Sequence, residues 1–119
     1  MALPFVTAIV VAAGNSTRMG RNKLLLSVGG EPLIVKTVAA FVNAESVRDI
    51  VVVTSSDDVK KAITEKQFSK NIMFADGGNC RQESVRNGFY AVSPNTEIVC
   101  VHDGARPFVL ADDIDSVNA

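Results

Sequence analysis

Four runs of apolar and β-branched residues are spaced along the chain, and each has the length of a single strand. They are Val6–Val11, Ile50–Thr54, Ile72–Ala75 and Ile98–His102. Their nearly continuous apolar character is typical of strands that are covered on both faces. The pattern therefore predicts a parallel sheet that lies between two layers of helices.

Two longer segments between these runs have the period of an amphipathic helix. The first begins near Pro32, a residue that is favourable in a first turn. Its apolar stripe consists of Ile34, Val38, Phe41 and Val42. The second covers Asp57–Lys66, and Ser56 precedes it as the expected N-cap. Both helices would cover the sheet with their apolar faces.

A third helical pattern precedes the last strand. We expect it to open at Asn79, which can cap a helix, with Gln82 three residues on as in a capping box. Its predicted buried stripe is Val85, Phe89 and Val92. A fourth, short helix is expected to begin around Ala111.

The order of these elements defines the expected fold class. Strands that alternate with helices predict an α/β domain, Rossmann-like and doubly wound, with a mostly parallel sheet. The 119 residues fit one domain, so we take 1–119 as a single unit. Because only four main strands are predicted and the last helix has little room, we expect the domain to be truncated at its C-terminus.

Composition and charge exclude several functional classes. The chain is 47% hydrophobic and 21% charged, with a net charge of −1, so it can bury a core but lacks the basic excess of a general nucleic-acid or membrane-surface binder. The apolar stretch Phe5–Ala13 is too short to span a bilayer, and no signal-peptide layout is visible. Cys80 and Cys100 have no disulfide or zinc spacing, which favours a cytoplasmic location.

The segment after the first strand has the properties of an anion-binding loop. It runs from Ala12 to Lys23 and contains small residues, hydroxyls and the cations Arg18, Arg21 and Lys23. Small residues let main-chain N–H groups approach a phosphate, and cations balance its charge. The spacing fits neither a Walker A loop nor GxGxxG. The alternative is a tight strand-to-helix turn with solvated charges.

Three motifs follow one another along the chain. The first is Ala12-Ala13-Gly14, then Arg18-Met19-Gly20 and Lys23; the second runs from Gly77 to Gly88, and the third from Val101 to Phe108. The first motif is similar to the signature loop of the sugar-phosphate nucleotidyltransferases. The second and third resemble the segments GGxxRxxSVxNG and VHDxARPF of one family in that superfamily, the methylerythritol-phosphate cytidylyltransferases. The family usually has Pro-Lys-Gln around the loop lysine, whereas this chain has Asn22-Lys23-Leu24.

The resemblance implies a nucleotidyltransferase-type fold and an activity. Members transfer CMP from CTP to 2-C-methyl-D-erythritol 4-phosphate, releasing pyrophosphate, in the non-mevalonate route of isoprenoid biosynthesis. It further implies Mg²⁺, small-molecule substrates only, and a homodimer for the full-length protein. Family members continue well past this chain's length, so we expect this fragment itself to be inactive.

The resemblance assigns the phosphate site to the first loop. Arg18 and Lys23 would neutralise charge at the reacting phosphates, a role that electrostatic catalysis of phosphoryl transfer requires. The backbone of Ala12, Ala13 and Gly14 would hold the phosphates and ribose. The alternative for the two cations is a solvated pair.

The second motif is expected to recognise cytosine. Gly78, Asn79 and Ser84 would read the base through main-chain groups and one hydroxyl, and Arg81 would brace the pocket. The alternative makes Asn79 only a helix cap and Ser84 an exposed helix residue.

The third motif carries the expected metal ligand. Asp103 would bind Mg²⁺ shared with the CTP phosphates, and its alternative is a turn aspartate. Gly104 belongs to the same nucleotide-binding segment. Arg106 could contact substrate or equally fix the loop. We expect Asp76, His102 and Cys100 to be structural, His102 through hydrogen bonding.

Two other functions remain open from the sequence alone. A ribitol-5-phosphate cytidylyltransferase would share the layout, although Ser84-Val85 and Gly104-Ala105 favour the methylerythritol enzymes. The other possibility is a non-catalytic nucleotide-binding fragment.

Overall fold

A computed structural model describes residues 4–12, 27–28 and 30–104 of the chain. Its main sheet consists of β1 (Val6–Val11), β4 (Val47–Val53), β5 (Asn71–Ala75) and β6 (Ile98–Asp103). The helices are α1 (Leu33–Asn43), α2 (Asp57–Glu65) and α3 (Arg81–Ala91). The short strands β2 (Ser27–Val28) and β3 (Glu31–Pro32) form a separate hairpin.

The four main strands are all parallel and lie in the order β5-β4-β1-β6. The chain moves outward from β1 through β4 to β5, and then returns over α3 to place β6 on the other side of β1. All six residues of β1 are buried, since strands flank it on both sides and helices cover both of its faces. The predicted α/β fold with a parallel, doubly wound sheet is confirmed.

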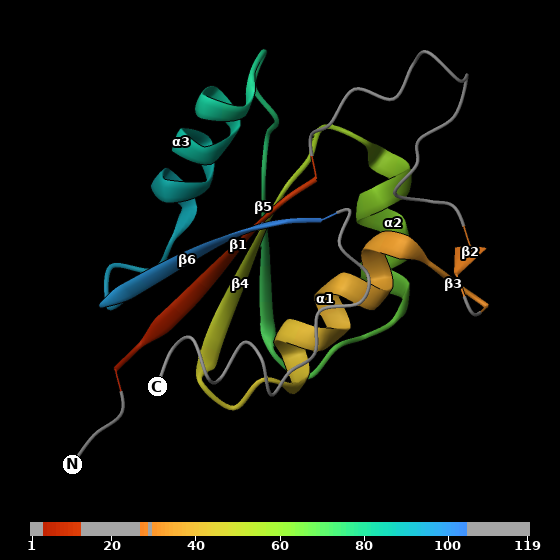
Figure 1. Cartoon of the computed structure of the whole chain (residues 1–119), viewed down its shortest axis with the longest axis horizontal. Coiled ribbons are helices and arrows are strands. Elements are labelled where there is room, and N and C mark those ends of the chain that lie inside the picture. The colour runs from red at the N-terminus through yellow and green to blue at the C-terminus, as the bar shows by residue number, and fades with distance from the viewer. Residues whose placement is uncertain (1–3, 13–26, 29, 105–119) are drawn as a thin grey trace.

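The helices form two layers around the sheet, with α1 and α2 on one side and α3 on the other (Figure 1). Alternate residues of each strand point to opposite faces, which explains why the strands need apolar residues at every position. The α1–α2 side is the larger core, with Phe41 and Ile34 among its fully buried side chains. On the α3 side, Ile9, Val11, Val51 and Val53 form a smaller core.

The segments α1 and α2 agree closely with the helices expected from the sequence. Pro32 is the residue before α1, and Ser56 caps α2 by accepting a hydrogen bond from the main-chain N–H of Val59. The first-turn acids Asp57 and Asp58 further suit the helix N-terminus. The strand β4 starts earlier than expected, at Val47, because Val47 and Asp49 extend the parallel pairing to Val6 and Thr7 of β1, with an irregularity in the register between them.

The expected start of α3 was wrong, and so was the burial of Phe89, whereas Val85 and Val92 of the predicted stripe do pack, partly buried, against the smaller core. The helix begins at Arg81, and its N-cap is Cys80, which makes no side-chain capping bond, so Asn79 and Gln82 form no capping box. The Phe89 side chain is 47% exposed, because the face of α3 that meets the sheet is centred on Ser84 and Gly88. A Cβ atom on Gly88 would lie 2.7 Å from a methyl carbon of Ile9, so the glycine lets the helix approach the sheet.

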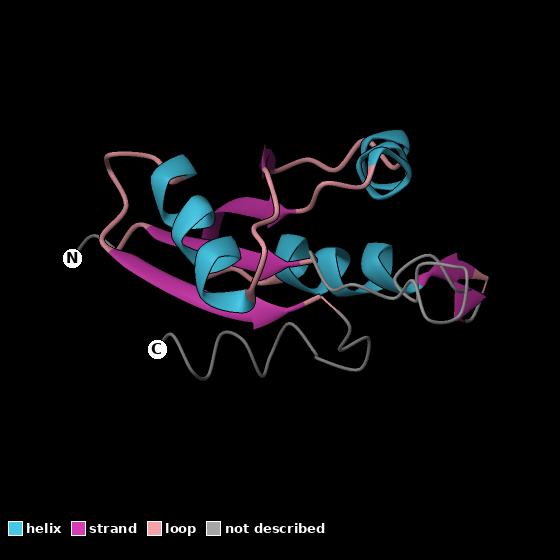
Figure 2. Ribbon diagram, turned by 90° about the horizontal axis from the view of Figure 1, so that it is seen from above, coloured by secondary structure: helices cyan, strands magenta, loops and turns pink. Residues whose placement is uncertain are grey.

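The β2–β3 hairpin was not predicted. It is antiparallel and contains Gly30 at a φ of +89°, a conformation that glycine adopts without strain. The hairpin lies beyond α1, away from the start of β1 (Figure 2). Two strands of two residues are too short to produce a hydrophobic period, but Gly29-Gly30 between them is a recognisable turn signal.

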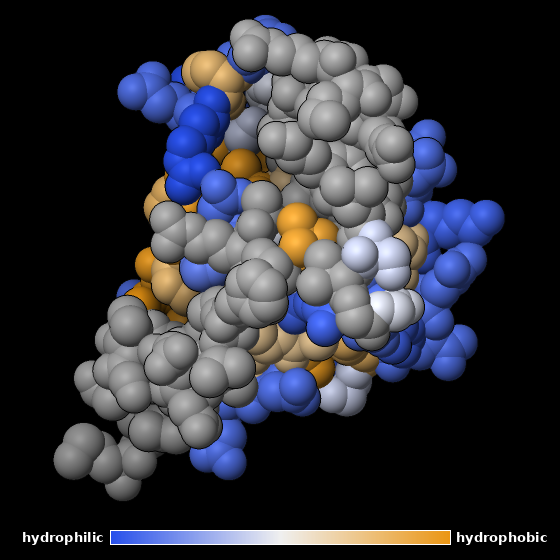
Figure 3. Space-filling model, turned by 45° about the vertical axis from the view of Figure 1, so that its right-hand side comes forward, coloured by the Kyte–Doolittle hydropathy of each residue, from blue (hydrophilic) through white to orange (hydrophobic). Residues whose placement is uncertain are grey.

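Among the coloured residues in Figure 3, hydrophilic side chains gather along the right-hand side of this face, and apolar side chains show near its middle and at its left. Among the described residues, the exposed large apolar side chains are those of Phe89, Tyr90, Ile98 and Val101. None of the described helices has both the length and the apolar character that a membrane span requires. The helix expected around Ala111 lies outside the described residues.

Candidate functional site at the carboxyl edge of the sheet

Parallel strands bring the segments that follow them to one edge of the sheet, the carboxyl edge. Main-chain hydrogen bonds hold this edge in place here. The N–H of Ala12 donates to the carbonyl of Val53 at 2.8 Å, and the N–H of Gly104 donates to the carbonyl of Val11 at 2.9 Å. These bonds extend the ladder past the ends of β1 and β6. The main chain at Ala12 and Gly104 is therefore held in a fixed position.

The direction of the connections changes between β1 and β6. The crossover after β1 leads to β4, whereas β6 on the other side of β1 is reached through α3. In open α/β sheets a ligand crevice forms outside the carboxyl ends of the strands at such a switch point. Ala12 and Gly104, two of the residues predicted for the nucleotide site, lie at the two strand ends that border it.

The turn after β6 is built around Gly104. This residue is buried, and a Cβ atom on it would lie 2.9 Å from Cδ1 of Ile34 and 3.1 Å from the carbonyl oxygen of Val11. Its carbonyl accepts a buried hydrogen bond of 2.9 Å from the hydroxyl of Thr37, on α1. The close packing and this bond together fix the turn that follows Asp103.

Asp103 ends β6 directly beside Val11 of β1, and its side chain is exposed. Within the described part of the chain, no group of three or more His, Cys, Asp or Glu side chains could hold a metal ion. If this edge binds phosphates as predicted, a single carboxylate still fits Mg²⁺, which is usually held by one or two carboxylates together with substrate phosphates. The chemistry of the site is thus compatible with the predicted role of Asp103.

The loop between β5 and α3 folds tightly against the start of the helix. Gly78 donates its N–H to the hydroxyl of Ser84 at 2.9 Å, and a Cβ atom on Gly78 would lie 2.5 Å from Cβ of Glu83. Ser84 is 2% exposed, so the alternative of an exposed helix residue was wrong. A hydroxyl that accepts one hydrogen bond still has its own hydrogen to donate, so base recognition by Ser84 stays a prediction.

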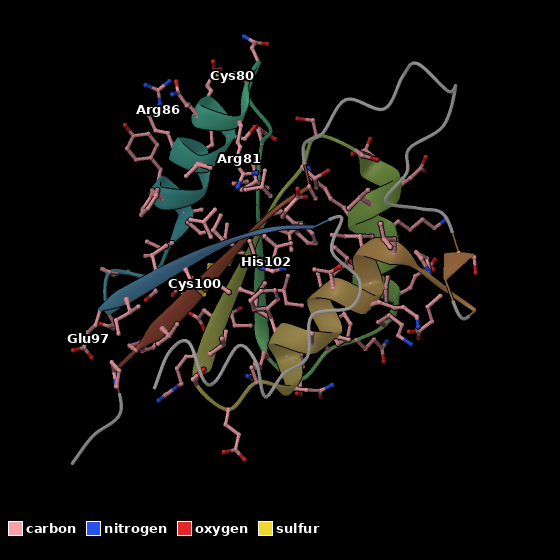
Figure 4. The ribbon with its side chains drawn as sticks, in the orientation of Figure 1. Cys80, Arg81, Arg86, Glu97, Cys100 and His102 are labelled. Carbon is pink, nitrogen blue, oxygen red and sulfur yellow. The ribbon has the colours of Figure 1, made fainter. Side chains whose placement is uncertain are left out.

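The first turn of α3 presents main-chain N–H groups at this same edge. Cys80 supplies no side-chain cap, and helix N-termini with unpaired N–H groups favour anionic or polar ligands. Figure 4 places Cys80 and Arg81 at this end of α3, with Arg81 on the side nearer the sheet and Arg86 on the outer side. Asn79, Cys80 and Arg81 are all exposed.

Three further residues were expected to be structural, and the structure gives their surroundings; the hydrogen bonding expected of His102 stays a prediction. The ring of His102 packs edge-on against Phe41, with centroids 5.0 Å apart, and Cys100 packs against the same core. The main-chain carbonyl of Asp76 accepts a hydrogen bond from Asn87, while its side chain is exposed. The sulfur atoms of Cys80 and Cys100 form no disulfide.

Several predicted site residues lie outside the described residues. They are Ala13, Gly14, Arg18, Lys23 and Arg106. Their assigned roles remain predictions from the motifs.

Sequence reasoning missed Thr37, Ser55 and Asn87, whose side chains fix the main chain at this edge. Ser55 accepts a hydrogen bond from Gly77, and Asn87 is the donor to Asp76. Asn87 lies inside the second motif and could have been singled out there. Thr37 and Ser55 carry no local signal, because their partners are 67 and 22 residues away.

Known proteins resemble the chain over nearly all of its length. Residues 6–119 match the family model of 2-C-methyl-D-erythritol 4-phosphate cytidylyltransferase. The enzyme of that name from Geobacillus thermodenitrificans is 46% identical over 86% of this chain and 46% of its own length. Its counterpart from Caldanaerobacter subterraneus is 42% identical over 87% of the chain and 48% of its own length.

Solved structures agree with this likeness. The 4-diphosphocytidyl-2C-methyl-D-erythritol synthase of Anaerococcus prevotii has a TM-score of 0.81 and 30% identity, and the match covers 95% of this chain and 49% of that one. A CMP:2-keto-3-deoxy-manno-octonic acid synthetase complexed with CTP has a TM-score of 0.71 at 16% identity, over 97% of this chain and 45% of that one, which shows the fold alone. The chain spans about half the length of the curated relatives it matches.

Proposed function

Since the chain belongs to the 2-C-methyl-D-erythritol 4-phosphate cytidylyltransferase family, we propose that it is the nucleotide-binding part of an enzyme that transfers CMP from CTP to that sugar-alcohol phosphate. The products are 4-diphosphocytidyl-2-C-methyl-D-erythritol and pyrophosphate. The observation that carries the proposal is the family match over residues 6–119. The shared carboxyl edge, to which all three motif-bearing segments lead, supports it.

The proposed reaction needs positioning and charge neutralisation more than proton transfer. A phosphate oxygen of the acceptor, already anionic at neutral pH, attacks the α-phosphorus of CTP. A new P–O bond forms, the bond from the α-phosphorus to the oxygen that bridges to the β-phosphorus breaks, and pyrophosphate leaves with that electron pair. No general base is required, which is consistent with phosphoryl-transfer sites that work by in-line positioning and electrostatics.

Each segment at the edge has a part in this proposal. Arg18 and Lys23 neutralise charge that develops on the phosphates, and the main chain at Ala12 holds the nucleotide. Asp103 would hold Mg²⁺, which when bound supplies further charge neutralisation of the CTP phosphates. Its position at the end of β6, beside the end of β1, supports that role.

The base is assigned to the loop between β5 and α3. Gly78, Asn79 and Ser84 contact cytosine, and Arg81 braces the pocket. The tight Gly78–Ser84 hydrogen bond supports a fixed shape for this loop. A rigid set of main-chain donors and acceptors suits the recognition of a small planar base.

The test is product formation by the whole protein that carries this chain. It would be incubated with CTP, Mg²⁺ and either 2-C-methyl-D-erythritol 4-phosphate or ribitol 5-phosphate, and pyrophosphate release would be followed. We expect release with the methylerythritol phosphate and little with ribitol phosphate or with CTP alone. Preference for ribitol 5-phosphate would assign the other acceptor, and no release with either would refute catalysis.

The oligomeric state, the location and the kind of ligand are proposed from the same family membership. The whole protein would form a homodimer in the cytoplasm and would act on small molecules rather than nucleic acid or membranes. The mass of the purified whole protein in solution, measured by light scattering, tests the dimer. A monomeric mass would contradict it.

A further inference from the structure

The loop from Asp76 to Cys80 is tied down by side chains that the proposed chemistry does not use. The main-chain N–H of Gly77 donates to the hydroxyl of Ser55 at 3.0 Å. Next to it, the side-chain amide of Asn87 donates to the main-chain carbonyl of Asp76 at 2.8 Å. With the bond between Gly78 and Ser84, three consecutive residues of the loop have their main chain fixed.

These ties come from two different elements. Ser55 belongs to the connection between β4 and α2, whereas Asn87 is in the middle of α3. The α3 side is itself held close to the sheet at Gly88, where a Cβ atom would lie 2.7 Å from Ile9 and 2.9 Å from Val53. The loop is thus held both by a neighbouring connection and by a helix that packs closely on the sheet.

A loop with two adjacent glycines needs such ties to have one shape. Glycine loses more conformational freedom on ordering than any other residue, so Gly77-Gly78 would otherwise sample many conformations. A loop that is already ordered binds its ligand more tightly, because the cost of ordering is met before binding. Gly78 is needed in spite of this, since a Cβ atom there would lie 2.5 Å from Cβ of Glu83.

We infer that Ser55 and Asn87 are positioning residues, which hold the base-binding loop in the conformation that accepts the CTP base. The inference rests on the proposed function and adds two residues that do not touch the nucleotide. Ser55 acts on Gly77 and Asn87 acts on Asp76, so both would act on CTP only through the loop. The loss of either should weaken CTP binding while turnover at saturating CTP changes little.

The size of the effect follows from a single lost hydrogen bond. Such a bond typically corresponds to roughly a three- to tenfold change in affinity. Replacing Ser55 by alanine removes its acceptor. Replacing Asn87 by aspartate keeps the shape but leaves only acceptor oxygens against the carbonyl of Asp76.

The chain offers a matched control for each variant. Ser56 is adjacent to Ser55, but its hydroxyl caps α2 at Val59, so Ser56→Ala should lower the thermal midpoint and leave CTP affinity unchanged. Asn95 is exposed in the connection between α3 and β6, at the opposite edge of the sheet, so Asn95→Asp adds the same charge away from the loop. The variant Ser55→Thr keeps a hydroxyl and should restore affinity.

The experiment is isothermal titration of the whole protein with CTP and Mg²⁺, together with thermal unfolding and turnover at saturating CTP. We expect CTP affinity to fall about three- to tenfold in Ser55→Ala and Asn87→Asp and to stay within about twofold in both controls and in Ser55→Thr. Affinities in Ser55→Ala and Asn87→Asp that equal those of the controls would overturn the inference. So would losses of affinity that simply follow thermal midpoints across all variants. If the unaltered protein binds no CTP, the proposed function itself fails, and the inference fails with it.

Discussion

Replacing Thr37 by valine removes one buried hydroxyl while keeping nearly the same shape. That hydroxyl donates to the carbonyl of Gly104 at 2.9 Å and lies 3.3 Å from the carbonyl of Leu33 in its own helix. A hydroxyl has a single hydrogen, so the shorter bond, which links α1 to the turn after β6, is the main one. The variant therefore separates the link to the turn from ordinary packing inside α1.

The expected magnitude follows from burial. Thr37 is fully buried, and a buried carbonyl that loses its partner costs about 1–3 kcal/mol. The matched control is Thr64→Val, because the Thr64 hydroxyl also bonds the carbonyl four residues earlier, at Lys60, but on the exposed surface of α2. That change should alter the free energy of unfolding by no more than about 0.5 kcal/mol.

Urea unfolding of the whole protein measures both effects, and amide hydrogen exchange locates them. Thr37→Val should lower the unfolding free energy by about 1–3 kcal/mol at an unchanged urea slope. It should also speed exchange of the Gly104 N–H, which bonds the carbonyl of Val11. Equal stability of the Thr37 and Thr64 variants, with unchanged exchange at Gly104, would refute the role given to this hydroxyl.

Three other predictions concern the packing of α3, the pair of Lys66 and Glu31, and the cations of the first loop. Gly88→Ala should lower the thermal midpoint, because overpacking against Ile9 and Val53 costs about 1–3 kcal/mol while the better helix propensity of alanine returns only about 1 kcal/mol. The control is Arg86→Ala, on the exposed side of α3. An unchanged midpoint for Gly88→Ala would show that the helix can move. The Lys66 ammonium hydrogen-bonds Glu31 and lowers the pKa of that carboxyl, so Lys66→Met should raise the pKa towards 4.5 in an NMR titration. The small contribution of this pair to stability is present above the ordinary glutamate pKa and is lost as the pH falls through the lowered pKa of Glu31. An unchanged pKa of Glu31 in Lys66→Met would refute the pairing. Arg18→Ala and Lys23→Ala should each reduce turnover by an amount equivalent to about 2.7–4 kcal/mol with little loss of stability, and normal turnover in both would remove these residues from the site.

The four strands of the main sheet and two of the helices could be predicted because their signals are local. Apolar runs such as Val6–Val11 match the observed strand end to end, and Ser56 caps α2 as its position suggested. Parallel strands then force the segments after them to one edge, so the location of Asp103 beside β1 followed from the order of elements. The fold class, and the edge of the sheet at which the three motifs meet, could therefore be predicted from the sequence.

The face of α3 that packs on the sheet could not be predicted from such local signals. Hydrophobicity favoured burial of Phe89, but the helix meets the sheet through Gly88, a residue that contributes nothing to a hydrophobic stripe. The helix also begins later than predicted, at Arg81 instead of Asn79. The hydroxyl of Ser84 reaches back to Gly78, so the chain before Arg81 remains a loop instead of a first turn.

The roles of residues whose partners are distant along the chain could also not be predicted from the sequence. Thr37 and Ser55 are ordinary polar residues until the fold brings Gly104 and Gly77 to them. Their importance depends on geometry that no spacing rule encodes.

The central claim is that the carboxyl edge of this sheet binds CTP, and amide chemical shifts test it most directly. Isotope-labelled whole protein would be titrated with CTP and Mg²⁺, and the shift of each assigned main-chain N–H would be followed. The largest changes should occur at Ala12, Gly78, Ser84 and Gly104, which follow β1, β5 and β6. Saturable shifts concentrated instead at the opposite edge, around Asn95 and Glu97, would contradict the account.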